Sequence, residues 1–270
     1  MYVSYLLINV GGNPDRPRPG RLWLRNVYHV HQRLSMAFPA PQTCGDDPQF
    51  LRPFDPDGFE RPRFLFRIDN AIRENTPCAM IVVQSRERPD WGYAFHNAGM
   101  FLATAPEIRS YHFSCDSGDK FGFRTLMNLS KKIKTSRDGA DLRKLSGATD
   151  AAGRPKSQSK RVSLTWEGEG AKPEDVIVPW FAAKGIIKTT EGEKKAYSLC
   201  SCRVLRMGWT YGKKPKTARS GVEHGLKFRS ALLEGTLEVG NAQAFARMVE
   251  DGLGAGKAFG FGLLSIMGGG

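Results

Sequence analysis

The hydrophobic pattern of the first 90 residues predicts one strand, one helix and two further strands. Apolar and polar positions alternate over residues 2–10, which is the period of a half-buried strand. Over residues 26–39 the apolar positions recur three and four apart, which predicts an amphipathic helix with Asn26 as its N-cap. Short β-rich runs at residues 63–69 and 78–85 predict a pair of strands. Strand, helix, strand, strand is the opening of a ferredoxin-like unit.

The second half predicts a similar arrangement. Strand-like runs are expected at residues 107–115 and 119–130; the elements after them are a helix at 173–185, strands at 196–209 and 226–240, a helix from Asn241 to Gly252 and a strand at 261–266. The first strand of this second unit must then come from within 107–130. The predicted fold class is α+β, with two tandem ferredoxin-like (βαββαβ, RRM-like) domains at residues 1–106 and 107–270.

The net charge of +13 and the pI near 9.7 are the strongest global signal. A chain this basic favours a polyanionic partner, most often nucleic acid, although an anionic membrane surface or solubility alone would give the same balance. No apolar run approaches the ~20 residues that span a bilayer, and the N-terminus is typical of a strand and not of a signal peptide. Five cysteines at irregular positions do not resemble a disulfide framework. We therefore expect a cytoplasmic nucleic-acid-binding protein with no membrane partner.

Residues 131–161 differ in composition from the rest of the chain. They are poor in large apolar side chains and carry ten basic residues against three acidic ones. Such a composition predicts a loop that is mobile in the free protein. Two alternatives stay open: the loop becomes ordered on nucleic acid, or it is a solvated insertion without a role.

Glycines cluster between the last predicted helix and the last predicted strand, in GLGAGKAFGFGLLSI at residues 252–266. Glycine permits positive φ, and successive N–H groups in such a loop can form an anion-binding concavity. Lys257 adds a point charge. The spacing fits neither a P-loop nor a dinucleotide-binding motif. The loop is therefore a candidate phosphate-binding site, with a purely structural tight connection as the alternative.

Metal-ligating residues are not clustered in the sequence. Cys200 and Cys202 share a strand face, and His224 is a possible third ligand, which falls short of a zinc site. No paired carboxylates stand out, so a metal-dependent nuclease is the weakest of the functions considered. We expect no metal and no cofactor. A basic protein that cleaves nucleic acid without a metal must use side-chain acid–base catalysis.

Tyr28 and His31 lie three residues apart on the predicted helix, so they are neighbours on its surface. Histidine has a reference pKa of about 6.5 and can give or take a proton near neutral pH. RNA supplies its own nucleophile, the 2′-hydroxyl, and a protonated tyrosine can orient a group or donate to it. His29 lies about 200° away from His31 around the helix and is expected to point elsewhere. The plain alternative is that His31 is a partly buried, hydrogen-bonded histidine.

Three stretches of the chain resemble the CasE family of CRISPR repeat-RNA endoribonucleases, from the type I-E systems. YHVHQRLSMAFP at residues 28–39 is similar to the family's early Tyr-x-x-His helix. LLEGTLEVGNAQAFARMVEDGLGAGKAFGFGLLSI at residues 232–266 is similar to its closing strand, helix, glycine-rich loop and strand. The start, MYVSYLLIN, resembles the family's first strand.

The resemblance implies a metal-independent endoribonuclease that binds the stem-loop of the CRISPR repeat RNA. It implies cleavage at the 3′ base of the stem by 2′-hydroxyl attack, which leaves a 2′,3′-cyclic phosphate. It also implies that the protein stays on the product as a subunit of the Cascade complex. His31 corresponds to the catalytic histidine and Tyr28 to its partner tyrosine. Some members have a lysine where this chain has Met36, so Arg33 or Lys257 would supply the cation at the scissile phosphate.

RNA contacts are expected mainly at phosphates, because the major groove of A-form RNA is narrow. The candidate RNA-binding residues are Arg33, Arg124, Lys131, Lys132, Lys134, Arg154, Lys156, Lys160, Arg161, Gly254, Gly256, Lys257 and Gly260, with Lys213, Lys214 and Lys216 as a second basic cluster. The alternative from a different class is a non-catalytic subunit in which the same fold only holds the RNA hairpin. The intact pair of Tyr28 and His31 favours the enzyme, since a pure binding protein would not need it.

Overall fold

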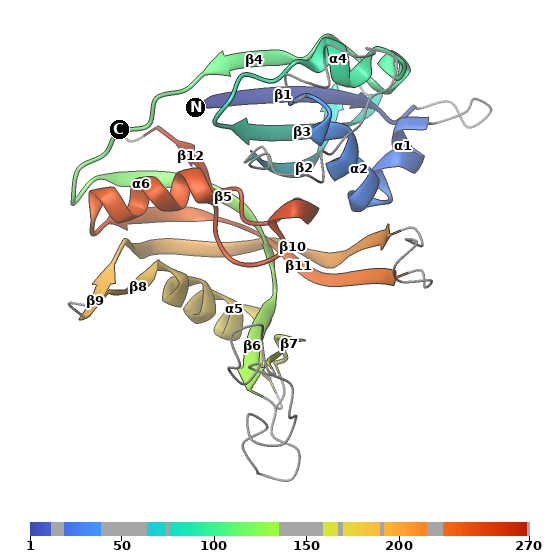
Figure 1. Cartoon of the computed structure of the whole chain (residues 1–270). Coiled ribbons are helices and arrows are strands. Elements are labelled where there is room, and N and C mark those ends of the chain that lie inside the picture. The colour runs from blue at the N-terminus through green and yellow to red at the C-terminus, as the bar shows by residue number, and fades with distance from the viewer. Residues whose placement is uncertain are drawn as a thin grey trace, which may run out of the picture.

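The computed structural model describes residues 1–11, 19–38, 64–73, 76–134, 159–166, 170–189, 192–214 and 224–268. Its elements form two α+β units, each built on a four-stranded antiparallel sheet (Figure 1). The predicted fold class, two tandem ferredoxin-like domains, is confirmed.

The first domain has the ferredoxin-like strand order β2-β3-β1-β4. Its elements are β1 (Tyr2–Asn9), α1 (Pro19–Leu24), α2 (Val27–Ser35), β2 (Phe64–Arg73), β3 (Thr76–Ser85), α4 (Trp91–Phe95), the 3-10 helix η1 (Gly99–Phe101) and β4 (Glu107–Ser110). Val30 and Leu34 of α2 share a buried cluster with Phe66 of β2 and Ile81 of β3. Helix α2 therefore packs on one face of the sheet, beside the edge strand β2.

The second domain repeats this order as β10-β11-β5-β12. Its main elements are β5 (Lys120–Asn128), α5 (Pro173–Ala182), β10 (Tyr197–Lys214), β11 (His224–Val239), α6 (Ala242–Asp251) and β12 (Ser265–Met267). Two hairpins are inserted, β6 (Ser130–Lys134) with β7 (Ser159–Ser163) and β8 (Ile186–Thr189) with β9 (Gly192–Lys195). Two 3-10 helices, η2 (Ala183–Gly185) and η3 (Lys257–Phe259), complete the described elements.

Several sequence predictions are confirmed, and two are wrong in detail. The helix predicted at 26–39 is α2, with Asn26 as its cap, and the first strand of the second unit is β5. The strand predicted at 107–115 ends at Ser110 and pairs with β1 instead of β5, because it completes the first sheet. The domain boundary at residues 106 and 107 stays a prediction. The strand predicted at 261–266 is shorter, since only Ser265–Met267 pair with β5.

The two ends of the basic insert, residues 131–161, are strands, whereas the sequence predicted a loop over the whole insert. Lys131 to Lys134 pair in antiparallel register with Ser159 to Val162, so the two ends of the insert form a hairpin stem. The remainder of the insert lies outside the described residues. Cross-strand hydrogen bonds can form between strands of any composition, and for this reason composition alone did not reveal the stem.

The two domains pack through the second face of the first sheet. Alternate side chains of its strands point away from α2, and among them Leu65 and Val82 form a buried cluster with Leu263 of the C-terminal segment. Gln84 donates a hydrogen bond of 2.6 Å to the main-chain oxygen of Val249 in α6. These contacts hold the C-terminal segment against β2 and β3.

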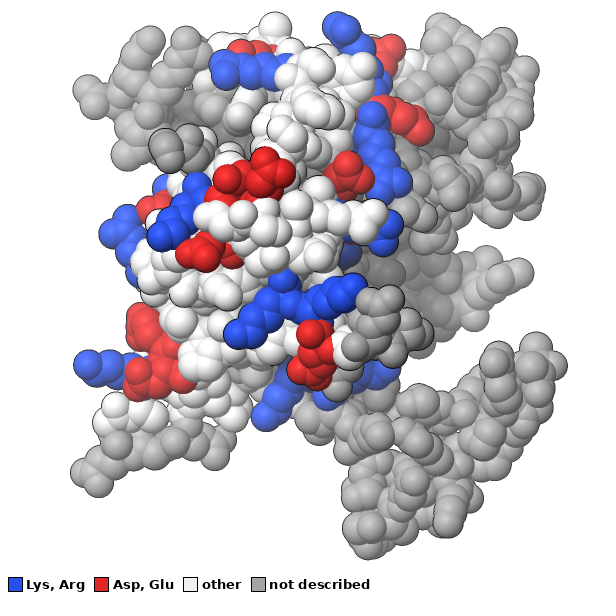
Figure 2. Space-filling model, turned by 90° about the vertical axis from the view of Figure 1, so that its left-hand side faces the viewer, with Lys and Arg blue, Asp and Glu red and all other residues white. Residues whose placement is uncertain are grey.

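Charges of both signs are interspersed on the face shown in Figure 2, which is the left-hand side of Figure 1. This face is therefore not a uniform basic surface for a polyanion. Within the described ranges, no helix combines the length and the apolar character that crossing a bilayer requires.

Candidate active site and nucleic-acid interface

Helix α2 carries the predicted tyrosine–histidine pair and is capped by Asn26. The Oδ1 atom of Asn26 accepts a hydrogen bond from the main-chain N–H of Tyr28 at 3.2 Å. Tyr28 and His31 are half-buried, whereas His29 is exposed. The two histidines therefore lie in different surroundings, as the helical period predicts.

The imidazole of His31 lies against two aromatic rings of the edge strand β2. It stacks on Phe64 with ring centroids 5.2 Å apart and an interplanar angle of 23°, and on Phe66 at 6.4 Å and 21°. The ring of Phe38 extends this stack, at 5.4 Å from Phe64. The Nδ1 atom of His31 is buried, but the residue as a whole is only half-buried. His31 thus packs with the core on one side and keeps an accessible part for a ligand.

The glycine-rich loop follows α6 and turns sharply around η3. Gly256 and Gly260, which bracket η3, are both left-handed. At Gly262 a Cβ atom would lie 2.0 Å from the main-chain oxygen of Leu253, so no residue with a side chain fits there. At Gly262 the glycine is therefore required by close packing, as the alternative of a purely structural tight connection expects. A phosphate-binding role stays a prediction for the rest of the loop.

The glycine-rich loop brings Lys257 to the edge of the first domain where His31 lies. Helix η3 packs against both α2 and β2. Lys257 lines a cavity of about 350 Å³ with Phe64, Glu250 and Asp251. Burial lowers the pKa of the Lys257 ammonium group, and the charge of Asp251 opposes this shift. Since the ring of Phe64 also stacks on His31, His31 and Lys257 both lie beside β2 although they are far apart in the sequence.

Two predicted RNA-binding arginines already have partners within the protein. Arg33 donates from Nη1 to the main-chain oxygen of Ala94 at 3.0 Å and to Oδ1 of Asn97 at 2.9 Å, and burial lowers its pKa. Arg124 donates from Nε to Oε2 of Glu234 at 2.8 Å. Contacts of these two arginines with RNA stay a prediction.

The other basic candidates lie mostly on two hairpins. The members in β6 and β7 are Lys131, Lys132, Lys134, Lys160 and Arg161, of which Lys131, Lys132 and Arg161 are exposed. Lys213 and Lys214 end β10. Arg154, Lys156 and Lys216 lie outside the described residues. The structure thus places the basic residues Lys131, Lys132, Lys134, Lys160 and Arg161 together on the β6–β7 hairpin. They are more than 90 positions from Tyr28 and His31 in the sequence.

Asn26 has a second role that sequence reasoning missed. Its Oδ1 atom accepts a hydrogen bond from the main-chain N–H of Lys213 at 2.9 Å, and its Nδ2 donates to the main-chain oxygen of Lys213 at 3.1 Å. A Cβ atom at Gly212 would lie 3.3 Å from Cγ2 of Val27, so the backbone of β10 lies close to the side chain of Val27. The end of β10 is therefore tied to the first turn of α2. An N-cap asparagine is visible in the sequence, but a partner 187 positions away is not.

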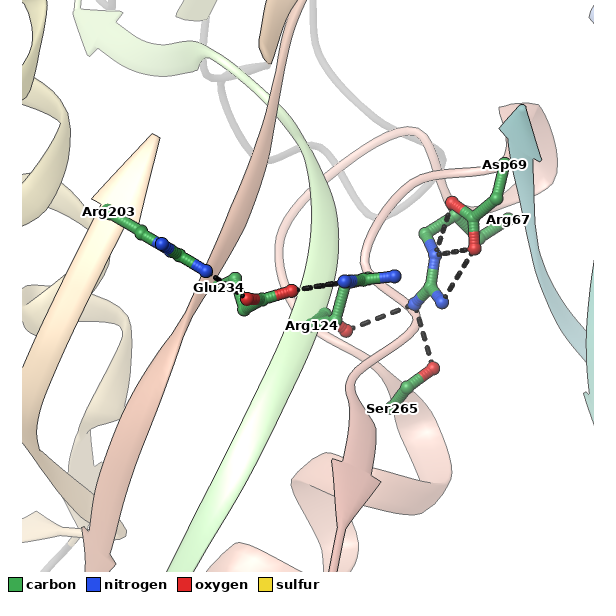
Figure 3. Close-up of polar contacts among 6 residues, drawn as sticks. All are labelled: Arg67, Asp69, Arg124, Arg203, Glu234 and Ser265. Atoms are coloured by element: carbon green, nitrogen blue, oxygen red, sulfur yellow. Dashed lines mark hydrogen bonds and ion pairs between the residues drawn. The ribbon is translucent and has the colours of Figure 1, made fainter. Parts of the chain in front are cut away.

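A buried arginine, also missed, joins the two domains (Figure 3). Arg67 of β2 is 4% exposed and donates to Asp69 from Nε and from Nη2, each at 2.9 Å. Its Nη1 donates to the main-chain oxygen of Arg124 at 3.0 Å and to Oγ of Ser265 at 2.7 Å. These bonds fix β2, which carries the rings that stack on His31, against β5 and β12.

The ion pairs continue beyond Arg124 into the second sheet (Figure 3). Glu234 of β11 accepts hydrogen bonds from Arg203 of β10, at 2.7 Å, and from Arg124 of β5. These two guanidinium groups hold the pKa of the Glu234 carboxyl below its usual range. Three neighbouring strands are thus linked by charged side chains on the sheet face that looks toward the first domain.

No metal site is evident in the part of the chain that the structure describes. No group of three or more His, Cys, Asp or Glu side chains is arranged there to hold an ion. Cys115, Cys200 and Cys202 are free thiols, and burial raises the pKa of Cys202 to about 11.

Fold and site together define a tandem ferredoxin-like protein with a tyrosine–histidine helix and a glycine-rich loop at the junction of its domains. The chain belongs to the CRISPR associated protein family, which matches residues 1–267, and the resemblance to the CasE family is confirmed. The CRISPR-associated endoribonuclease Cse3 of Thermus thermophilus is 24% identical over 271 residues, which cover 98% of this chain and 99% of that protein.

Solved structures share the fold, among them the following two. The CRISPR endoribonuclease Cse3 bound to 19 nt RNA has a TM-score of 0.60 at 23% identity, with 99% of this chain and 100% of that chain covered. A chain of a CRISPR RNA-guided surveillance complex in a pre-nicking state has a TM-score of 0.52 at 17% identity, with 98% and 99% covered.

Proposed function

We propose that this chain is a metal-independent endoribonuclease that binds the stem-loop of CRISPR repeat RNA and cuts at the 3′ base of the stem. The observation that carries the proposal is that His31 of α2, the helix that also bears Tyr28, and Lys257 of η3 both lie beside Phe64. The relatives named as Cse3 endoribonucleases support RNA as the substrate. Membership of the CRISPR associated protein family supports the repeat as the source of that RNA.

The proposed reaction uses the RNA's own nucleophile. The 2′-oxygen forms a bond to the adjacent phosphorus, the bond from phosphorus to the 5′-oxygen breaks, and a 2′,3′-cyclic phosphate remains. One proton leaves the 2′-oxygen and one joins the 5′-oxygen, so the site must transfer protons. His31 carries out one of these transfers, and the phenol of Tyr28 orients or donates to the reacting group. The ammonium group of Lys257 balances the charge that accumulates on the phosphate oxygens.

Packing around His31 supports this role. The rings of Phe64 and Phe66 fix the plane of the imidazole before substrate arrives, and such preorganisation of a catalytic group lowers the barrier. Burial of Lys257 works in the same direction, because a charge with less surrounding water acts more strongly on a nearby phosphate.

We further propose that the β6–β7 hairpin contacts the phosphates of the stem and that the protein stays on its product within a Cascade surveillance complex. The exposed cations Lys131, Lys132 and Arg161 support the first part. The surveillance-complex chain of the same fold supports the second.

The test compares two histidines of one helix. Repeat hairpins are incubated with the wild-type chain, His31→Ala and His29→Ala in excess chelator, and both cleavage and binding are measured. We expect a single cut with a cyclic-phosphate end, a loss of about 10²–10⁴-fold in rate for His31→Ala, and little change for His29→Ala, since that side chain is exposed. Hairpin binding should persist in both variants.

Other outcomes would reject parts of the proposal. Cleavage that appears only with added Mg²⁺ would contradict the metal-independent mechanism. Cleavage that is unaffected by His31→Ala would remove that residue from the reaction. Tight binding without any cut would favour the non-catalytic hairpin-binding subunit.

A further inference from the structure

Aromatic and cationic side chains alternate along one face of the β10–β11 hairpin. The register pairs Trp209 with Arg229 and Tyr211 with Lys227, and directly opposite residues project from the same face. The Nζ atom of Lys227 lies 4.2 Å from the ring centroid of Trp209 and 6.0 Å from that of Tyr211. The guanidinium of Arg229 lies 3.7 Å from the ring centroid of Trp166, which follows β7. We call these five side chains the aromatic ladder.

The ladder is exposed although its rings are large. Trp209 is 48% exposed and Tyr211 is 53% exposed. Side chains of this kind usually contribute to a core, and a group of them at the surface marks a binding site. In Figure 1 the ends of β10 and β11 that lead to their connecting turn project beyond α5. Trp209 and Tyr211 therefore keep free surface, even with a cation beside each ring.

The charge around the ladder identifies the kind of ligand. Residues 205–213 and 224–233 contain no Asp or Glu. Lys213 pairs with Gly225, two residues before Lys227, so it adds a third cation to the ladder's face. Aromatic faces that stack bases, combined with cations that contact phosphates, are the means by which proteins bind unpaired nucleic acid. Bases within a duplex are already stacked on one another and offer no free face. The ladder therefore suits unpaired nucleotides and not the stem itself.

The position of the ladder connects it to both parts of the proposed RNA site. Arg229 donates to the main-chain oxygen of Leu164 at 3.1 Å, and its own main-chain oxygen accepts from Leu129 at 2.8 Å, so one end lies at the base of the β6–β7 hairpin. The other end is Tyr211, two residues before Lys213, whose backbone is bound by the Asn26 cap of α2. The ladder thus extends from the proposed stem-binding hairpin toward the helix of Tyr28 and His31.

We propose that the aromatic ladder stacks the unpaired nucleotides that flank the repeat hairpin, and so holds the strand that enters or leaves the site. This inference rests on the proposed function, because it takes the RNA hairpin as the ligand. Each base lost from an aromatic platform weakens binding by about tenfold or more.

The test measures affinity for hairpins with and without an unpaired flank of about four nucleotides, placed on the 5′ side in one RNA and on the 3′ side in another. A 2′-deoxynucleotide at the cut prevents cleavage. We expect a flank to tighten binding to the wild-type chain, and the double variant Trp209→Ala/Tyr211→Ala to lose about tenfold or more of that gain. Affinity for the unflanked hairpin should not change. Trp209→Phe, which keeps an aromatic face, should retain most of the gain.

Leu205→Ala is the matched control, because Leu205 is 40% exposed on the same strand and lies outside the ladder. Equal losses for flanked and unflanked RNA would overturn the inference. So would unchanged affinity for both, which would assign the surface to a protein partner. If the double variant does not fold, as judged by its melting temperature, Trp209→Ala and Lys227→Gln are measured singly with the same expectations. Cleavage of the unflanked hairpin by the wild-type chain, and its loss in His31→Ala, tests the proposed function independently.

Discussion

Replacing Asn26 by alanine should disturb helix α2 more than the loss of an ordinary helix cap does. Asn26 caps α2 through Tyr28, and it also makes two hydrogen bonds to the backbone of Lys213. The chain contains a matched control in Asn241, whose Oδ1 caps α6 by accepting from the N–H of Ala244 at 2.9 Å. Both variants remove an N-cap, and Asn26→Ala also releases β10 from α2.

The expected difference follows from these bonds. Loss of an asparagine N-cap costs about 1 kcal/mol of stability, and this cost is common to both variants. Each of the two bonds to Lys213 adds about 0.5–1.5 kcal/mol. They lie near the surface, where the freed groups can bind water, so the low end of that range applies. Asn26→Ala should therefore destabilise the chain by about 1–2 kcal/mol more than Asn241→Ala.

Urea unfolding measures the stability and single-turnover cleavage of the repeat hairpin measures the function. We expect Asn26→Ala to slow cleavage by about tenfold, because a small displacement of Tyr28 misaligns the reacting groups, while Asn241→Ala cleaves normally. Asn26→Asp keeps both acceptor bonds and loses only the bond from Nδ2, so it should fall between the wild-type chain and Asn26→Ala. Equal losses of stability in the two alanine variants, with equal cleavage rates, would refute the role of the link between α2 and β10.

Three further predictions test the parts of the domain junction. Arg67→Met should cost about 3–5 kcal/mol in urea unfolding, because Arg67 is 4% exposed and its loss leaves Asp69 unpaired; a loss below about 1 kcal/mol would contradict this. Gly260→Ala and Gly254→Ala should both lose about 1–2 kcal/mol of stability, because each glycine has a positive φ. The added Cβ at Gly254 would meet the flexible end of Met127, whereas at Gly260 it would press on the Phe66 ring, at 3.1 Å, so only Gly260→Ala should also slow cleavage. Lys257→Met should reduce the slope of log K for hairpin binding against log salt concentration by about one, because one phosphate contact is lost. Because burial lowers the pKa of Lys257, the wild-type chain should gain stability relative to Lys257→Met as the pH rises from that lowered pKa toward the ordinary value of 10.5, as urea midpoints across this range would show.

The predictable part of the fold is the part with a strong local period. The helix at 26–39 and the helix from Asn241 have apolar stripes and asparagine caps, and both form as expected. The segment WGYAF at 91–95 forms α4, but five residues are too few to display a helical period. Strand β4 pairs with β1 because of its place in the first sheet, and four mostly exposed residues carry no pattern that would indicate that partner.

The same distinction applies to the site. Tyr28, His31 and the glycine-rich loop were predicted because their chemistry is visible in short stretches of sequence. The rings of Phe64 and Phe66 were recognised only as strand residues, although their alternation indicates that they share one face. That this face would meet His31 depends on how α2 docks, and such long-range packing has no local signature. The link from Asn26 to the end of β10 is of the same kind.

Strand β2 explains why the site needs both domains. On one face its Phe64 and Phe66 rings hold the imidazole of His31. On the opposite face Arg67 binds β5 and β12 of the second domain. η3 with Lys257 packs against β2, which is an edge strand of the sheet that the described residues form. The distance between His31 and Lys257 is therefore set by the packing of two domains on one strand. If these residues act as proposed, a perturbation of the domain interface far from the RNA should change cleavage before it changes binding.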